Sequence, residues 1–347
     1  MAWIIATRLN TNILQILFWG MIWVQYGCTR PSPPVYAGAK MKGVNLVAPP
    51  EPIDSAAFVP LSTLKAEWVA VVPYGFCREN EPHFYFNSNK MWWGESIEGI
   101  AKTIELAHRN KLKVMLKPHV WVGRGMYTGD FDLKTEADWQ TFEKDFGNYI
   151  LTNARIADSL KVELFCIGTE MDNFTQKRPA FWKNIIKEVR KIYQGQLTYA
   201  DNWNHYPKNP FWNELDFIGI DAYFPLSSEK HPTIETLQKG WKPHLSEIEN
   251  FAGKYQKPIL FTEIGYRSVD FATEKPWESH DEKPENLALQ ADAYQAFFNE
   301  VWPRKWLAGA FAWKWFLQQP KRQFHRDTFS PQFKPAETVL QNAFGQR

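Results

Sequence analysis

Two glutamates stand at the ends of two strongly apolar runs of the chain. Glu170 follows such a run in "CIGTEMDNF" (166–174), and Glu263 follows another in "PILFTEIGY" (258–266). Two carboxyl groups that flank a glycosidic bond can cleave it, because one protonates the departing oxygen while the other attacks the anomeric carbon. The structural alternative is that each glutamate is a salt-bridge partner or a helix cap. Since an uncompensated buried carboxylate is costly, two of them in such apolar surroundings favour the chemical role.

The elements that must position these glutamates are short apolar segments that alternate with amphipathic ones. Each apolar segment is hydrophobic on both alternating faces, which is typical of strands covered by helices. The predicted strands are 41–47, 68–76, 112–120, 162–170, 197–203, 217–225, 258–266 and 307–316. Apolar residues at helical spacing predict helices over 95–111, 135–160 and 285–302, whereas 209–215 predicts a turn or two at best.

This alternation predicts an α/β fold with one catalytic domain, a (β/α)8 TIM barrel over residues 41–347. A doubly wound open sheet is the alternative. That fold would place a glycine-rich phosphate loop after the first strand, but Gly43 stands alone there.

In a barrel, polar residues at the carboxyl ends of the strands project into the mouth, where such enzymes keep their active sites. Glu170 ends the fourth predicted strand and Glu263 ends the seventh, so the two could face one another across the mouth. The further candidates at this level are His119, Asn202, Trp203, Asp221, Tyr223, Trp313 and Trp315. A satisfied structural histidine is the alternative for His119, and core packing is the alternative for Asn202, Trp203, Tyr223 and Trp313.

The amino-acid composition limits the classes of molecule that the protein is expected to bind. A net charge of +2 without a long run of like charges argues against nucleic acid. The chain has 17 Trp among 347 residues, far above average usage, and indole faces serve both core packing and stacking on sugar rings. Because no Cys/His spacing resembles a zinc site, and His119 has no ligand-spaced partner, we expect no metal and no cofactor.

The first thirty residues differ from the rest. Arg8 precedes the apolar stretch "ILQILFWGMIWV" (13–24), which is short for a membrane span and suits an export signal. Gly27-Cys28 resembles the end of a bacterial lipoprotein signal, although Gln25 departs from that pattern. We therefore expect a signal over 1–28, a tether over 29–40 and an exported protein anchored through Cys28. An uncleaved anchor, or ordinary cleavage near Gly27, is the alternative.

Six segments resemble glycoside hydrolase family 113, which comprises retaining (β/α)8 enzymes that act on β-1,4-mannans. The resemblance runs from about residue 41 to 320 and is carried, in order, by "KGVNL", "AHRNKLKVMLKPHVWV", "FCIGTEMDNF", "FIGIDAYFPLS", "ILFTEIGYRS" and "FAWKWF". It implies that Glu170 is the acid/base, that Glu263 is the nucleophile and that Tyr223 orients Glu263. The wider clan usually has asparagine before the acid/base, whereas this chain has Thr169.

These observations lead to a retaining β-glycosidase that acts on β-mannan or manno-oligosaccharides. We expect a monomer, with substrate-binding residues His119, Thr169, Asn202, Trp203, Tyr223 and Trp313. Another β-linked glycan as substrate, or a carbohydrate-binding lipoprotein without catalysis, are the alternatives. The sequence does not separate endo from exo action, and the connection over 267–284 could close one end of the cleft.

Overall fold

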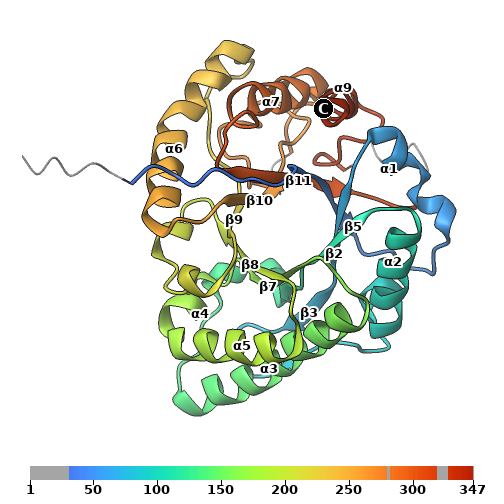
Figure 1. Ribbon diagram of the computed structural model, residues 1–347, viewed down its shortest axis with the longest axis vertical. Helices are drawn as coiled ribbons and strands as arrows, with labels where there is room; N and C mark the ends of the chain where they lie inside the picture. Colours follow the sequence, from blue (N-terminus) through green and yellow to red (C-terminus); the bar gives the residue numbers. More distant parts are fainter. Residues whose placement is uncertain (1–30, 280–281, 319–326, 347) are drawn as a thin grey trace, which may run out of the picture. The chain divides into compact units, whose positions relative to one another are not determined.

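The computed structural model describes residues 31–279, 282–318 and 327–346. Among these residues, eight parallel strands close a barrel in the spatial order β1-β11-β10-β9-β8-β7-β5-β2, surrounded by helices (Figure 1). This confirms the predicted TIM barrel. The barrel strands are β1 (Met41–Val47), β2 (Trp68–Val72), β5 (Lys113–Leu116), β7 (Leu164–Thr169), β8 (Gln196–Asn202), β9 (Ile218–Asp221), β10 (Ile259–Ile264) and β11 (Leu307–Trp315).

The three helices predicted from the sequence each begin at a capping side chain. Ser96, Thr135 and Asn286 each accept a hydrogen bond from the backbone of the first turn of α2, α3 and α7, which confirms the three predicted helices. Between β8 and β9 the described chain makes only short 3-10 turns, at Tyr206–Lys208 and Trp212–Glu214. The α-helices are α1 (Val59–Leu64), α2 (Ile97–Arg109), α3 (Glu136–Ser159), α4 (Asp172–Lys177), α5 (Pro179–Ile192), α6 (Ile234–Tyr255), α7 (Leu287–Glu300) and α9 (Pro335–Gly345).

Two predicted strands divide at a proline, which is a correction to the sequence prediction. The segment 68–76 becomes β2 and β3 (Tyr74–Cys77) on either side of Pro73, and 112–120 becomes β5 and β6 (His119–Val122) around Pro118. Proline has no N–H to donate to a neighbouring strand, so the ladder stops there. Beyond the break, β3 pairs with β6 and with β4 (Phe84–Tyr85) in a small separate sheet.

Most of the large aromatic side chains serve the core. Trp182, Trp212, Trp241 and Trp315 are fully buried, so the high tryptophan content is to a large extent a packing property. Inside the barrel, Phe311 lies against β1, where a Cβ on Gly43 would come within 2.3 Å of its ring. The lone glycine of the first strand therefore makes room for a core ring.

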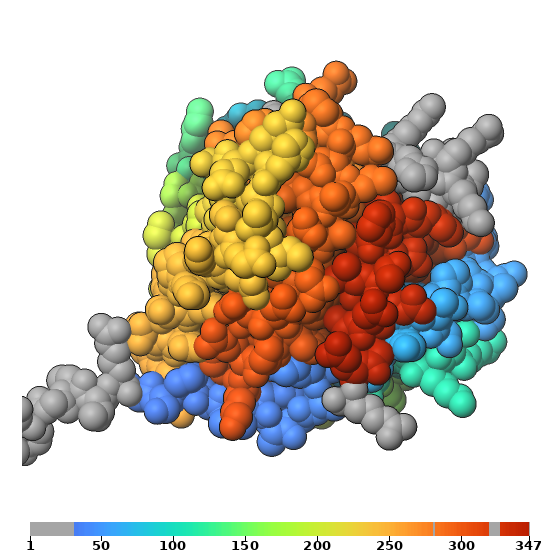
Figure 2. Space-filling model, turned by 90° about the horizontal axis from the view of Figure 1, so that it is seen from above, coloured from blue at the N-terminus to red at the C-terminus, as the bar shows by residue number. Residues whose placement is uncertain are grey.

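The segment 31–40 has no regular secondary structure, yet it contacts the amino-terminal end of the barrel. The Tyr36 backbone N–H donates to the Lys305 carbonyl at 2.8 Å, and the Tyr36 ring meets the Phe217 ring edge-on at 6.1 Å. Figure 2 shows this dark blue segment against the deep orange chain near residue 300. Residues 1–30, with the expected signal and Cys28, lie outside the described residues. Within the described residues, none of the helices combines the length and the apolarity needed to span a membrane.

Candidate active site

Glu263 lies on β10 with both carboxyl oxygens engaged. The Tyr223 hydroxyl donates to Oε2 at 2.5 Å, and the Lys117 ammonium donates to Oε1 at 2.5 Å. The Nε2 atom of His119 lies 3.4 Å from the same Oε1. Glu263 is only 4% exposed, so these charge-assisted contacts act with little competition from water.

The neighbours of Glu263 hold it as a carboxylate. Burial alone would raise its pKa, but the positive charge of Lys117 and the contact with His119 lower the pKa to about 2. His119 is itself neutral at pH 7, because burial and the nearby Lys117 ammonium lower its pKa to about 4. Lys117 is therefore the main electrostatic partner of Glu263.

Lys117 also joins Glu263 to Asp221 of β9. Its Nζ lies 3.2 Å from Asp221 Oδ1, which accepts a second hydrogen bond from the Thr262 hydroxyl at 2.7 Å. Burial and the negative charge of Glu263 raise the pKa of Asp221 to about 7. One fully buried ammonium thus serves two buried carboxyl groups. Lys117 is not among the residues predicted from sequence, although a lysine within the apolar run 112–120 is a usable signal, because a buried cation requires an anionic partner.

Glu170 has the opposite environment. It follows β7 directly, has a positive φ of 49°, and its N–H donates to the Ala200 carbonyl at 2.8 Å. No side chain in the described parts of the chain donates a hydrogen bond to its carboxyl group. Burial, followed by the negative charges of Asp221 and Glu263, raises the pKa of Glu170 well above its ordinary value. Glu170 therefore retains its proton under conditions in which Glu263 is ionised.

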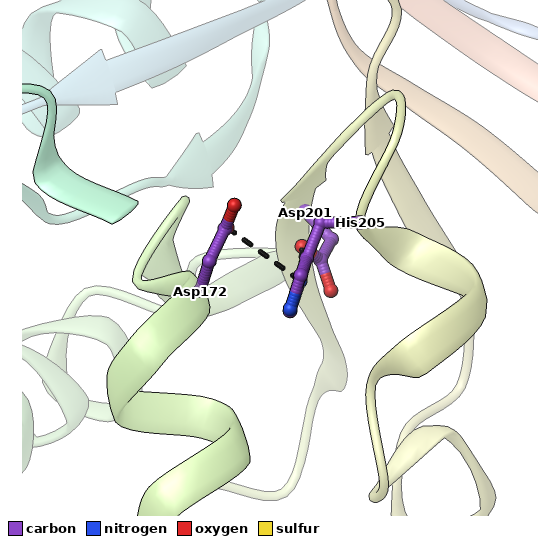
Figure 3. Close-up of side chains that lie close together, drawn as sticks. All are labelled: Asp172, Asp201 and His205. Atoms are coloured by element: carbon purple, nitrogen blue, oxygen red, sulfur yellow. Dashed lines mark hydrogen bonds and ion pairs between the residues drawn. The ribbon is translucent and has the colours of Figure 1, made fainter. Parts of the chain in front are cut away.

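A polar network lies beside Glu170. The Asn202 amide donates to the Tyr127 hydroxyl at 2.5 Å, and that hydroxyl lies 3.4 Å from Asp172 Oδ2. In Figure 3, His205 lies beside the carboxyl groups of Asp172 and Asp201, with its Nδ1 2.8 Å from Asp201 Oδ1 and 3.5 Å from Asp172 Oδ1. Although burial opposes the charged ring, the hydrogen bond and the charge of Asp201 raise the pKa of His205.

These three residues are the group, among the described ones, whose ligand atoms are close enough to hold a metal ion. The hydrogen bond and the charge of Asp201 favour the protonated form of His205, which places a positive charge and an N–H between Asp172 and Asp201. A metal bound at Nδ1 would have to displace that proton. This geometry is that of an ionic hydrogen-bond network, which links the loop that carries Tyr127 to Asn202 at the end of β8.

The structure brings together four of the residues singled out from sequence. Glu263, His119 and Tyr223 are in direct contact, and the Trp313 indole lies nearly parallel to the His119 ring, with centroids 5.8 Å apart. Asn202 joins the Glu170 side through Tyr127, a residue that sequence reasoning missed because it lies in the loop after β6.

Two other candidates have different partners. Thr169 is buried and its hydroxyl donates to the Pro118 carbonyl at 3.3 Å. Trp203 stacks on Trp277 with ring centroids 5.3 Å apart, and Trp277 belongs to the long connection over 267–284. This contact ties that connection to the loop after β8.

The arrangement pairs a carboxylate fixed in its ionised form with a carboxyl group held in its protonated form. Both project from carboxyl ends of barrel strands, and their charges influence one another. Divergent pKa values within one pair of carboxyl groups are the property that assigns one as nucleophile or base and the other as acid.

Comparison with solved structures gives matches over nearly the whole chain. A glycoside hydrolase family 113 β-mannanase from Alicyclobacillus acidocaldarius, AaManA in complex with ManMIm, is 24% identical, covers 89% of this chain and 98% of its own, and has a TM-score of 0.79. A structure described as a family 113 β-1,4-mannanase is 25% identical, with 89% and 100% coverage and a TM-score of 0.77. A β-glucuronidase from Ruminococcus gnavus shares the fold at 13% identity, over 88% of this chain and 50% of its own, with a TM-score of 0.59.

The family itself is identified from the sequence. No curated protein matches the chain. The model of Glycoside Hydrolase Family 113 matches residues 55–330, a span that includes both glutamates, Lys117 and the residues around them. Since this match covers most of the chain, the protein belongs to glycoside hydrolase family 113.

Proposed function

We propose that this glycoside hydrolase cleaves β-1,4-mannosidic bonds in mannan or manno-oligosaccharides with retention of configuration. Glu263 is the nucleophile and Glu170 is the acid/base. The observation that carries this assignment is the opposite displacement of the two carboxyl pKa values, downward for Glu263 and upward for Glu170. An unprotonated nucleophile and a protonated acid are the states that the first step requires.

In the first step, Glu170 protonates the glycosidic oxygen while a Glu263 oxygen attacks the anomeric carbon. The aglycone leaves, and the sugar is held as an ester of Glu263. Glu170, now ionised, accepts a proton from water, whose oxygen attacks the same carbon and releases the sugar. Tyr223 and Lys117 orient the Glu263 carboxylate before attack, and the Lys117 ammonium keeps Asp221 as a partner when the ester removes the charge of Glu263.

The choice of mannan rests on the family and on its solved members. Those structures are described as β-mannanase and β-1,4-mannanase, and they superpose on this chain over 89% of its length. The Trp313 ring lies parallel to that of His119 and next to Lys117, and an indole there can stack on the sugar bound beside Glu263. Asn202, Trp203 and Thr169 remain proposed substrate-binding residues.

Product analysis on mannohexaose tests this proposal. We expect hydrolysis, and NMR of the first product should show the β-anomer before mutarotation. Glu263→Ala should abolish turnover, whereas Glu79→Ala, the same change at an exposed glutamate, is the matched control and should not. An α-anomeric first product would contradict the double displacement. The size distribution of the products decides between endo and exo action.

Two alternatives predict different results. If the substrate is another β-linked glycan, a panel of nitrophenyl glycosides and polymers should show turnover on a β-glucan or β-glucoside and none on mannan. If the protein only binds carbohydrate, no β-mannoside should be hydrolysed at a rate that depends on Glu263.

The proposed chemistry uses no metal, so EDTA should leave kcat/KM on mannohexaose unchanged. The Asp172, Asp201 and His205 cluster makes this a meaningful control, because a metal there would lie next to Tyr127. A loss of activity with EDTA that Zn²⁺ or Mg²⁺ restores would contradict the mechanism.

We also propose that the protein is exported, anchored through a lipid on Cys28, and monomeric. The support for export and anchoring is the apolar stretch over 13–24, followed by Gly27-Cys28. Metabolic labelling with palmitate in a bacterial host should mark the wild type but not Cys28→Ser. Light scattering of the purified chain measures its oligomeric state.

A further inference from the structure

The small sheet formed by β4, β3 and β6 presents a row of aromatic rings. Phe76 on β3 lies opposite Tyr85 on β4 and opposite Trp121 on β6. Directly paired residues on neighbouring strands project from the same face of a sheet. Tyr85 is 46% exposed and Trp121 is 57% exposed, which is unusual for rings of this size.

The opposite face of the same sheet is packed against the protein. Phe84 of β4 contacts Phe142, Phe146 and Tyr149 of α3, with ring centroids 5.0–5.9 Å apart. Next to Phe76, Gly75 allows the Phe84 ring to come close, since a Cβ there would lie 2.2 Å from it. The sheet is thus anchored through one face, and packing does not account for the rings on the other.

The exposed face continues into the active site. Two residues before Phe76 and Trp121, on the same face, stand Tyr74 and His119, which are again paired across β3 and β6. His119 Nε2 lies 3.4 Å from Glu263 Oε1. The Tyr74 ring lies 5.1 Å from that of His119 and 6.4 Å from that of Trp121. A step of two residues along a strand covers about 6.6 Å, so the rings lead outward from Glu263 at short intervals.

We propose that the face made by Phe76, Tyr85 and Trp121, here named the aromatic platform, binds sugar units of the substrate beyond the one bound beside Glu263. The inference rests on the proposed function and specifies its ligand: a neutral β-linked hexopyranose chain long enough to extend from Glu263 onto the platform. Pyranose rings present C–H faces that stack on aromatic rings. Because the platform is continuous with His119, which lies beside Glu263, we infer that its occupant is the distal part of the same glycan. Binding of a protein partner instead is an outcome that the test would reveal.

The experiment compares a short and a long substrate. The kcat/KM values for mannotriose and mannohexaose are measured for the wild type, Trp121→Ala and the double variant Tyr85→Ala/Trp121→Ala. We expect the double variant to lose about fivefold or more in kcat/KM on mannohexaose, mainly through a higher KM. The loss on mannotriose should be much smaller. Trp121→Tyr, which keeps a ring, should recover most of the long-substrate value.

The matched control is Tyr255→Ala, at the carboxyl end of α6, where the chain returns to the other end of the barrel. It should leave the ratio of the two kcat/KM values unchanged. Equal losses on the two substrates in the double variant, or no loss on either, would overturn the proposal. It would also be overturned if the kcat/KM ratio of the double variant returned to the wild-type value only when a protein partner was added.

A binding measurement separates this inference from the proposed function. Calorimetric titration of mannohexaose into Glu170→Gln, with and without the platform substitutions, needs no turnover. Weaker binding in the platform variant supports the platform even if mannan proves not to be hydrolysed. Equal affinity overturns it even if the wild type is an active mannanase.

Discussion

At the scale of single residues, Glu170 and Glu263 are the same side chain in different electrostatic surroundings. Glu263 has the Lys117 ammonium and the Tyr223 hydroxyl on its oxygens, whereas no described side chain donates to Glu170. Burial disfavours the ionised form of both, so the partners decide which one keeps its proton.

Replacing Lys117 tests this directly. Lys117→Met keeps the length of the side chain but removes its charge, so the pKa of Glu263 should rise from about 2. Because the nucleophile must be ionised, the acidic limb of the kcat/KM profile should move to higher pH. Lys113→Met, on the exposed start of the same strand, is the control and should keep the wild-type profile. An acidic limb that stays in place would show that Lys117 does not govern the ionisation of Glu263.

Glu170→Gln should act on activity and stability in opposite directions. Loss of the acid should lower kcat on mannohexaose by about 10²–10⁴. In the wild type the raised pKa of Glu170 gives stability below the pKa of the unfolded chain, and this is lost as pH rises through the folded pKa. The difference in Tm, variant minus wild type, should therefore become more positive as the pH rises from 4 to 8. A relative Tm that falls over this range would contradict a protonated Glu170.

At the scale of elements, barrel closure depends on a close approach between the first and last strands. Gly309 on β11 pairs with Met41 on β1 at a φ of +153°, and a Cβ there would lie 2.4 Å from the Met41 carbonyl oxygen. The two strands can meet at this point because residue 309 lacks a side chain.

Gly309→Ala should therefore lower the Tm by several degrees, since either the alanine or β1 must shift. Gly147→Ala in α3 is the matched control, because a Cβ there meets Phe181 at an ordinary 3.6 Å and alanine favours a helix. Thermal unfolding followed by circular dichroism measures both. A Tm for Gly309→Ala at or above that of the wild type would mean that the strands close without this approach.

At the scale of the whole molecule, the two ends of the barrel have separate tasks. The carboxyl ends of the strands carry the glutamates, while the segment 31–40 contacts the opposite end. There the Lys40 ammonium donates to the carbonyls of Arg304 and Leu307 at 2.7 and 2.9 Å, next to the contacts of Tyr36. Stability and catalysis can therefore be changed independently.

A chain that begins at residue 41 should have a lower Tm than one that begins at residue 31, because it lacks these hydrogen bonds and the contact of Tyr36 with the Phe217 ring. The kcat/KM values of the two chains on mannohexaose should agree, since the contacts of the segment with other described residues lie at the opposite end of the barrel. A change in kcat/KM without a change in Tm would indicate that the segment acts on the site.

Much of this protein could be predicted from its sequence. Apolar segments that alternate with amphipathic ones specify the strands and helices, because burial on both faces and burial on one face leave different periodicities. Glu170, Glu263, His119, Tyr223 and Trp313 could be found because they interrupt or follow such segments. The divisions at Pro73 and Pro118 were also visible in principle, since proline ends a ladder of strand hydrogen bonds.

Only the tertiary structure determines which of the two glutamates, Glu170 or Glu263, is ionised, and which aromatic residues form the platform. Asp221 and Glu263 are 104 and 146 residues from Lys117 along the chain, and the pKa of a buried group depends on charges a few ångströms away rather than on sequence neighbours. Likewise, Tyr85, Phe76 and Trp121 share one face only because three short strands pair in a particular register. Periodicity reports which side of an element is buried, whereas pairing in three dimensions determines which side chains meet.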